Sequence, residues 1–268
     1  MGDLLPFVLA LLGAGAFAGV LAGLLGVGGG IVLVPAYAAI LAAAGYDGAD
    51  MMQVCLATSL STILVTSIRS VLAHNRKGAV DWHILRGWAP WIMLGAIAGV
   101  GLVSRLTTRD LKIIFGVLVL VVASYMLLSR SEWRLADHPP QGVRRAGLAG
   151  TIGLVGVLLG IGGGSLGVPM LTLHGRPMHR AVATAAGLGA VIALPSVLAF
   201  LFVPAQDAPP GTVGSVNLAI FALTIATSLL TAPYGAALAH RTDPRRLKRI
   251  FALFLMAVAL NMLRKALL

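Results

Sequence analysis

The stretch Gly26-Val27-Gly28-Gly29-Gly30 interrupts an apolar segment of this sequence, and Val34-Pro35 follows it. The same pattern returns 134 residues later as Gly160-Ile161-Gly162-Gly163-Gly164, followed by Val168-Pro169. Ala57-Thr58 returns as Ala183-Thr184, and Arg105, Phe115 and Met126 return at an offset of 136 as Arg241, Phe251 and Met262. Such matches in the same order indicate an internal duplication, which is the usual build of secondary transporters.

The rest of the sequence is as apolar as the segments around these motifs. Of 268 residues, 58% are hydrophobic and 11% are charged, and the mean hydropathy is +0.94. A soluble domain of this length cannot bury so much apolar surface. Because a membrane-spanning helix needs about 20 apolar residues, we predict an all-α polytopic membrane protein with about eight to ten membrane segments. The apolar runs are Leu4–Leu25, Ile31–Ala44, Met51–Ala73, Trp88–Leu106, Leu111–Leu128, Val143–Leu159, Ser165–Leu173, Ala181–Val203, Val216–Ala239 and Ile250–Leu263.

The positive charges indicate how the two halves are oriented. The net charge is +11, and the bases cluster in short loops, which favours a role in membrane orientation over nucleic-acid binding. If each Gly-rich break turns the chain back, 14 of the 20 bases fall on one side of the membrane and five on the other. If each break is only a kink, the split is nine against ten. The positive-inside rule therefore favours two inverted repeats with broken or re-entrant helices.

This topology predicts the division of the chain and its location. The repeats are expected at residues 1–130 and 143–268, joined by a cytoplasmic linker at 131–142 that contains Pro139-Pro140. Met1-Gly2-Asp3 lacks the positive region of a secretory signal, so the first run is expected to belong to the mature protein. We predict a multi-pass membrane protein with both termini on the outer side of the membrane.

The Gly-rich breaks are the strongest candidates for a binding site. A new helix is expected to begin at about Ile31 and at about Ser165, and its first N–H groups have no partner within the helix. These groups and the positive end of the helix dipole bind anions without a charged side chain. The alternative is close helix packing through small residues. The predicted donors are Gly28, Gly29, Gly30, Gly162, Gly163 and Gly164, with Gly26, Pro35, Gly160 and Pro169 as the structural part of the motif.

Side chains near the breaks supply further candidates. Thr58, Ser59 and Thr184 offer hydroxyl donors for an oxyanion, unless they bond to carbonyl groups of their own or a neighbouring helix. Arg69 lies within an apolar run and either binds an anion or extends to the membrane interface. His74 is a candidate for proton coupling, with a simple interfacial loop as the alternative.

Other chemistry has little support in the sequence. None of the nine acidic residues lies in the middle of an apolar run, which argues against a cation substrate. His174 and His179 lack further metal ligands, and the single cysteine, Cys55, is expected to be a small buried side chain. We therefore predict no metal, no cofactor and no enzymatic activity.

The doubled glycine motif, the Ala-Thr pairs and the turn containing His74, Gly78 and Asp81-Trp82 together resemble the sulfite exporter TauE/SafE family of membrane permeases. The likeness covers nearly the whole chain. It implies transport of small sulfur-containing anions, such as sulfite or sulfoacetate, out of the cytoplasm across a bacterial inner membrane, with both termini then on the periplasmic side. The second half departs from the first, because Ser165 stands where the first half has Ile31, and Ser165 is expected to add a donor to the site.

The sequence thus predicts a secondary transporter of a small oxyanion that works by alternating access, with the lipid bilayer and the anion as its partners. An anion channel and, less plausibly, a membrane-embedded enzyme stay open as alternatives. A homodimer is compatible with the sequence, although nothing in it identifies an interface.

Overall fold

The computed structural model of the chain describes residues 4–25, 29–128, 134–239 and 244–267, which contain ten α-helices and one short pair of strands. The antiparallel strands β1 (Thr212–Val213) and β2 (Val216–Asn217) lie between α8 and α9. The prediction of an all-α polytopic membrane protein is confirmed. The helices are α1 (Leu4–Leu25), α2 (Gly30–Ala43), α3 (Met51–Asn75), α4 (Trp82–Val103), α5 (Thr108–Leu128), α6 (Gly142–Leu158), α7 (Gly164–Leu173), α8 (Met178–Phe200), α9 (Leu218–Ala239) and α10 (Pro244–Leu267).

Helix length separates membrane-spanning helices from partial ones. Seven helices in the described part of the chain are long and apolar enough to cross a membrane. The helices that follow the Gly-rich breaks are shorter: α2 has 14 residues and α7 has 10. At 1.5 Å per residue they are about 21 Å and 15 Å long, whereas the hydrocarbon core of a bilayer is about 30 Å thick. Both are therefore partial segments that begin inside the molecule.

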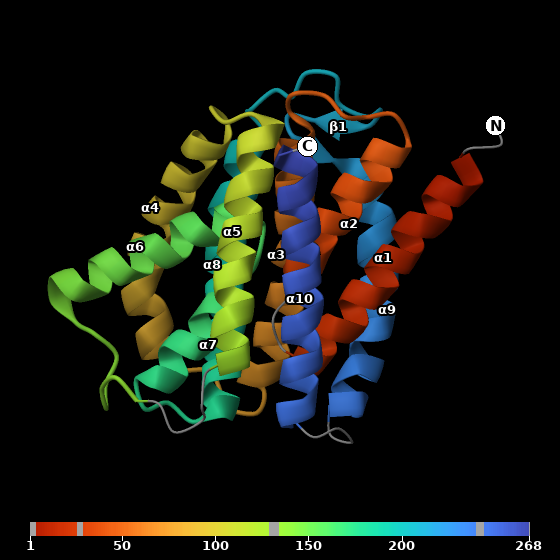
Figure 1. Cartoon of the computed structure of the whole chain (residues 1–268). Coiled ribbons are helices and arrows are strands. Elements are labelled where there is room, and N and C mark those ends of the chain that lie inside the picture. The colour runs from red at the N-terminus through yellow and green to blue at the C-terminus, as the bar shows by residue number, and fades with distance from the viewer. Residues whose placement is uncertain (1–3, 26–28, 129–133, 240–243, 268) are drawn as a thin grey trace.

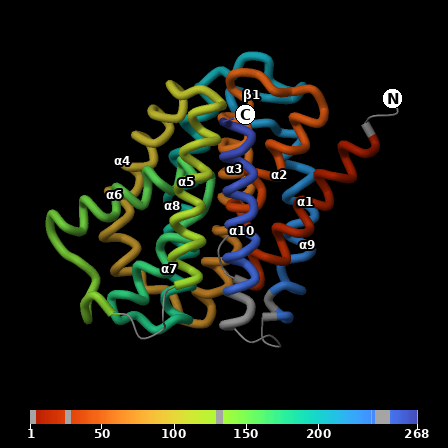
Figure 2. Tube along the Cα trace, viewed as in Figure 1, coloured from red at the N-terminus to blue at the C-terminus, as the bar shows by residue number. Residues whose placement is uncertain are grey.

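The directions of the helices show that the halves are inverted (Figure 1). α1 runs inward from the end of the bundle that carries the β hairpin, and α2 returns to that same end. α6 and α7 make the corresponding excursion from the opposite end. The tube in Figure 2 shows the two described chain ends, at α1 and α10, on the hairpin side of the bundle.

Helix packing repeats the same relationship. α1 packs along α9 while α6, the matching helix of the second half, packs along α4. α3 packs against α8, and α5 against α10, so each of these pairs joins two equivalent helices. α3 and α8 are the most buried long helices, with 78% and 67% of their most apolar windows inside the molecule. They form the centre, and every other element is placed around them.

Two helices begin six residues before the apolar runs that predict them. α4 begins at Trp82 rather than Trp88, and Asp81 caps it by accepting a hydrogen bond from Ile84 N at 3.2 Å. α10 begins at Pro244 rather than Ile250, with proline at the first helical position, where a missing N–H is tolerated. The apolar runs stop at the first polar residues, whereas the helices continue through them toward the ends of the bundle.

Candidate functional site

The two Gly-rich breaks meet at the centre of the molecule. A Cβ atom added to Gly30 would lie 2.6 Å from the carbonyl oxygen of Gly160 and 3.2 Å from Cα of Ile161. Only glycine permits this approach of one backbone to the other. The first turn of α2 and the end of α6, which lie 130 residues apart in the sequence, are thus in direct contact.

Ser59 of α3 holds the two breaks together. Its Oγ donates a hydrogen bond to the carbonyl oxygen of Gly160 at 2.8 Å, and Gly30 O lies 3.5 Å from the same hydroxyl. The side chain is fully buried. Ser59 was predicted as a donor to the ligand, and the structure uses its hydroxyl to fix the geometry of the breaks instead.

Neither short helix carries a side-chain cap at its start. Gly29 precedes α2 with a φ of 71°, a left-handed conformation that glycine adopts without strain, and Gly163 precedes α7. As the N-cap residues, Gly29 and Gly163 make no side-chain hydrogen bond to the first turn of their helices in the described structure. Because the first N–H groups of a helix lack intrahelical partners, both helix starts present donors and positive dipole ends.

The start of α7 also contains a buried hydroxyl that lacks a partner. Ser165 Oγ is inaccessible and has no hydrogen-bond partner among the described residues. Ser67 of α3 approaches the same break, since a Cβ atom added to Gly162 would lie 3.6 Å from Ser67 Oγ. A buried hydroxyl that makes no hydrogen bond is unfavourable by about 1–3 kcal/mol. The Ser165 hydroxyl is therefore free to donate a hydrogen bond to an acceptor that enters this break.

Thr58 and Thr184 occupy equivalent places, but at opposite ends of the bundle. Thr58 Oγ1 accepts a hydrogen bond from the backbone N–H of Asn217, and Thr184 Oγ1 accepts one from the backbone N–H of Asp81, both at 3.0 Å. Each threonine thereby anchors the start of a neighbouring helix, α9 or α4, to the central pair. Each oxygen thus already accepts one hydrogen bond from the backbone of a neighbouring helix start.

Asn217 is a residue that the sequence analysis missed. Its Oδ1 accepts a hydrogen bond from Ile220 N at 2.9 Å, as Asp81 Oδ1 does from Ile84 N, so the two residues cap α9 and α4 in the same way. The signal was present, because Val80-Asp81 and Val216-Asn217 are 136 residues apart, which is also the offset of the matches at Arg105, Phe115 and Met126. The match was missed because the second half has the neutral Asn217 where the first half has Asp81.

The two caps differ in their remaining contacts. Asp81 Oδ2 pairs with Arg176, in the loop between α7 and α8, at 3.3 Å. Asn217 Nδ2 instead donates to Pro210 O at 3.1 Å and to Thr212 Oγ1 at 2.8 Å. The cap of α4 is thus held by an ion pair and the cap of α9 by neutral hydrogen bonds.

The remaining predicted residues lie away from the centre or outside the described residues. Arg69 is exposed on α3, as an arginine that extends to the membrane interface would be. His74 is half-buried in the last turn of α3. Pro35 and Pro169 are each the sixth residue of their helix, where they withhold one intrahelical hydrogen bond. Gly26 and Gly28 lie outside the described residues. Gly164 is the first residue of α7 and is buried.

Metal ligands do not gather in the described ranges. No group of three or more His, Cys, Asp or Glu side chains there is placed to hold a metal ion. Cys55 is buried in α3.

Comparisons with known proteins agree with this architecture. The profile of the sulfite exporter TauE/SafE family matches residues 11–262. A probable membrane transporter protein of Haemophilus influenzae is 33% identical over 264 residues, which are 97% of this chain and 99% of that protein. Another of Methanocaldococcus jannaschii is 25% identical and covers 93% of this chain and 92% of its own length. No solved structure gives a significant match.

Proposed function

This chain belongs to the sulfite exporter TauE/SafE family, and we propose that it is a secondary transporter that exports small sulfur-containing anions, such as sulfite or sulfoacetate, by alternating access. That it is a multi-pass membrane transporter follows from the family and from its seven candidate membrane-spanning helices. The class of anion, the direction of transport and the binding site are the parts that we propose here.

The observation that carries the proposal is Ser165 Oγ, which is buried in the first turn of an uncapped helix and has no hydrogen-bond partner in the part of the chain that the structure describes. In the proposed complex, the N–H groups of Gly163, Gly164 and Ser165 donate to one oxygen of the anion, and the Ser165 hydroxyl donates to another. A sulfite or sulfonate group has several acceptor oxygens and no donor of its own when ionised. It therefore matches a site that consists only of donors.

The first half contributes through the contact between the breaks. Gly29 and Gly30 start α2 beside Gly160, and Ser59 fixes their separation. When one repeat moves, the contact between the breaks would displace the break of the other repeat as well. Alternating access about a central site requires such coupled movement of the two halves. We retain residues 1–130 and 143–268 as the two repeats, with 131–142 as the linker.

The distribution of acidic residues supports an anion rather than a cation. Asp50 and Asp81 lie outside the helices, as the residues that precede α3 and α4. Cation transporters commonly place carboxylates within the membrane. The excess of bases expected on the face that carries Arg176 supports a cytoplasmic position of that face in a bacterial inner membrane. The described chain ends, on the opposite face, would then be periplasmic.

The experiment that tests the site compares Ser165→Ala with Ser196→Ala. Ser196 is a matched control, because it is also buried but its hydroxyl bonds to Ile192 O of its own helix at 2.7 Å. Thermal unfolding of the purified protein is followed with sulfite, sulfoacetate, thiosulfate, sulfate, acetate and chloride at equal ionic strength. A ligand that binds the folded state raises the midpoint. We expect a shift confined to one or two sulfur oxyanions, which is retained in Ser196→Ala and reduced in Ser165→Ala.

Equal shifts in both variants would refute the role of Ser165. Counterflow of labelled substrate in vesicles then separates a transporter from a channel. A carrier couples the entry of labelled substrate to the exit of unlabelled substrate, whereas a channel does not. Substitution of Gly163 by valine is a weaker test, since a Cβ atom there would lie 2.6 Å from Ala185 O and Gly189 N. Loss of transport in such a variant would report packing as well as binding.

A further inference from the structure

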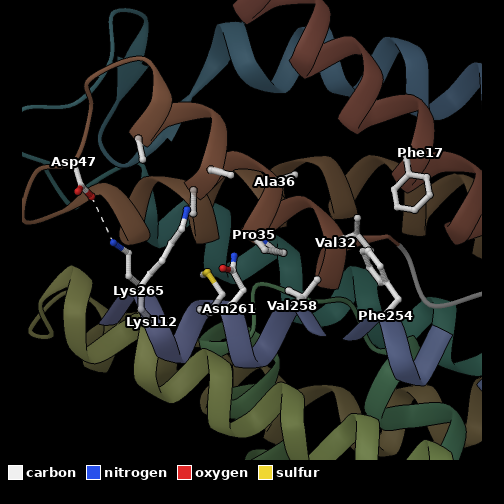
Figure 3. Close-up of a pocket in the computed structure, with 14 residues that line it drawn as sticks. Phe17, Val32, Pro35, Ala36, Asp47, Lys112, Phe254, Val258, Asn261 and Lys265 are labelled. Atoms are coloured by element: carbon white, nitrogen blue, oxygen red, sulfur yellow. Dashed lines mark hydrogen bonds and ion pairs between the residues drawn. The ribbon is translucent and has the colours of Figure 1, made fainter. Parts of the chain in front are cut away.

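A groove of about 480 Å³ runs along the outside of the bundle between α2 and α10 (Figure 3). Its walls are apolar over most of their length, with Val32, Pro35 and Ala36 of α2 facing Val258 of α10. α10 packs chiefly against α5, so the space between α10 and α2 is left unfilled by helix packing. This groove lies apart from Ser165 and has no part in the proposed transport site.

The mouth of the groove is positively charged. Lys112 of α5 and Lys265 of α10 line it, and Lys112 pairs with Asp47 at 3.4 Å. Arg109 joins both lysines around an adjoining pocket of about 340 Å³ that opens at the same place. Three bases thus face one carboxylate at the end of the bundle, where the helices leave the membrane.

The far end of the groove is closed by aromatic side chains. Phe17 of α1 and Phe254 of α10 meet edge to face, with ring centroids 5.8 Å apart. Phe254 and Lys265 are eleven residues apart on α10, which is about 16 Å along the helix axis. The hydrocarbon core of a bilayer is about 30 Å thick, so the groove is about as deep as one leaflet.

From this combination we infer that the groove binds one anionic phospholipid of the leaflet at the hairpin face. One acyl chain lies between α2 and α10 with its methyl end at the Phe17–Phe254 pair, and the phosphate group lies at Lys112 and Lys265. A small inorganic anion would match the charged mouth but would gain nothing from the apolar walls. A zwitterionic lipid would match the walls but would bring its own cation to the lysines.

The test measures binding of phosphatidylglycerol to the purified, delipidated protein by native mass spectrometry, with phosphatidylcholine and inorganic phosphate as comparison probes. We expect phosphatidylglycerol to bind best. Lys112→Gln and Lys265→Gln are each expected to weaken its binding by about fivefold, since a base near anionic lipid contributes about that much. Arg105→Gln is the matched control, because Arg105 is an exposed base at the same face that does not line the groove.

A second variant tests the apolar part separately. Ala39→Phe fills the groove from its exposed side and leaves all the bases in place. We expect it to abolish the preference for phosphatidylglycerol while the protein keeps its midpoint of unfolding. Binding that is unchanged in Ala39→Phe, or equally weakened by Arg105→Gln, would overturn the proposal. Inorganic phosphate that binds at the lysines as tightly as the lipid would also overturn it and would assign the mouth to a free anion.

Discussion

The hydroxyl of Ser59 donates a hydrogen bond to the carbonyl oxygen of Gly160 at 2.8 Å, and so joins α3 of the first half to the break of the second. The residue is fully buried, and Gly160 adopts a φ of 56° in which its carbonyl points toward this hydroxyl rather than along α6. The bond is a direct polar link between the two halves at the place where the Gly-rich breaks meet.

Removal of this link is expected to destabilise the fold. Ser59→Ala leaves a buried carbonyl oxygen without its donor, which is unfavourable by about 1–3 kcal/mol. Urea unfolding of the protein in detergent measures the loss. Ser61→Ala serves as the control, because Ser61 Oγ bonds to Ala57 O of its own helix at 3.0 Å and that carbonyl keeps its helical partner. Equal losses of unfolding free energy in both variants would show that the bond from Ser59 to Gly160 contributes no more to stability than the bond within α3.

Ser165→Ala is expected to act in the opposite direction in the absence of ligand. The substitution removes a buried hydroxyl that has no partner, so the free energy of unfolding should rise, by up to about 1–3 kcal/mol. The same change should lower the stabilisation by a bound oxyanion. A thermal scan with and without sulfite measures both. A variant that loses stability without ligand would indicate that the hydroxyl is already satisfied.

Thr58→Val and Thr184→Val are expected to have similar effects, because each deprives one backbone N–H of its acceptor. Thr58→Val removes the acceptor of the 3.0 Å hydrogen bond from Asn217 N, and Thr184→Val removes the acceptor of the 3.0 Å hydrogen bond from Asp81 N. We expect each variant to lose about 1–3 kcal/mol of unfolding free energy. Thr172→Val provides the comparison, since its hydroxyl bonds only within α7. A loss confined to one member of the pair would argue against their equivalence.

Asp81→Asn is expected to remove a salt-dependent part of the stability. The amide retains an oxygen that can cap α4, but the ion pair with Arg176 is lost. A pair of this exposure contributes up to about 1 kcal/mol at low salt, and added salt screens it. The midpoint of unfolding should therefore fall with salt more steeply in the wild type than in the variant. Asp47→Asn, which breaks a more exposed pair with Lys112, should change this slope less.

Asn217→Asp is expected to be worse tolerated than Asp81→Asn. Asn217 Nδ2 donates to Pro209 O, Pro210 O and Thr212 Oγ1, and a carboxylate there would turn an acceptor toward two carbonyl oxygens. Circular dichroism melting would record the loss, which we place at about 2 kcal/mol or more from the penalty for a buried unpaired charged group. A melting point like that of the wild type would contradict the assignment of these contacts.

The hydrophobic runs, the duplicated motif and the bias of the bases were enough to predict the helices and the inversion, but they left open whether the segments at α2 and α7 cross the whole membrane. These predictions succeed because burial in lipid requires each segment to be long enough and apolar enough, which can be judged from the sequence of that segment alone. The role of each hydroxyl could not be predicted in this way. Ser59, Thr58 and Ser165 are alike in sequence terms, and only the packing of helices distant in the chain decides which of them has a partner. The groove between α2 and α10 is likewise set by packing alone.

The pairing of α1 with α9 has a consequence for biosynthesis. Thr231 Oγ1 of α9 donates to Ala16 O of α1 across 215 residues of chain. At about 5–20 residues per second of synthesis, α1 therefore waits roughly 10–40 s before its partner helix emerges from the ribosome. During that time its small-residue face, with Gly15 and Gly19, can be covered only by lipid or by the insertion machinery. The packing of α1 against α9 can thus form only late in synthesis, after α9 has been made.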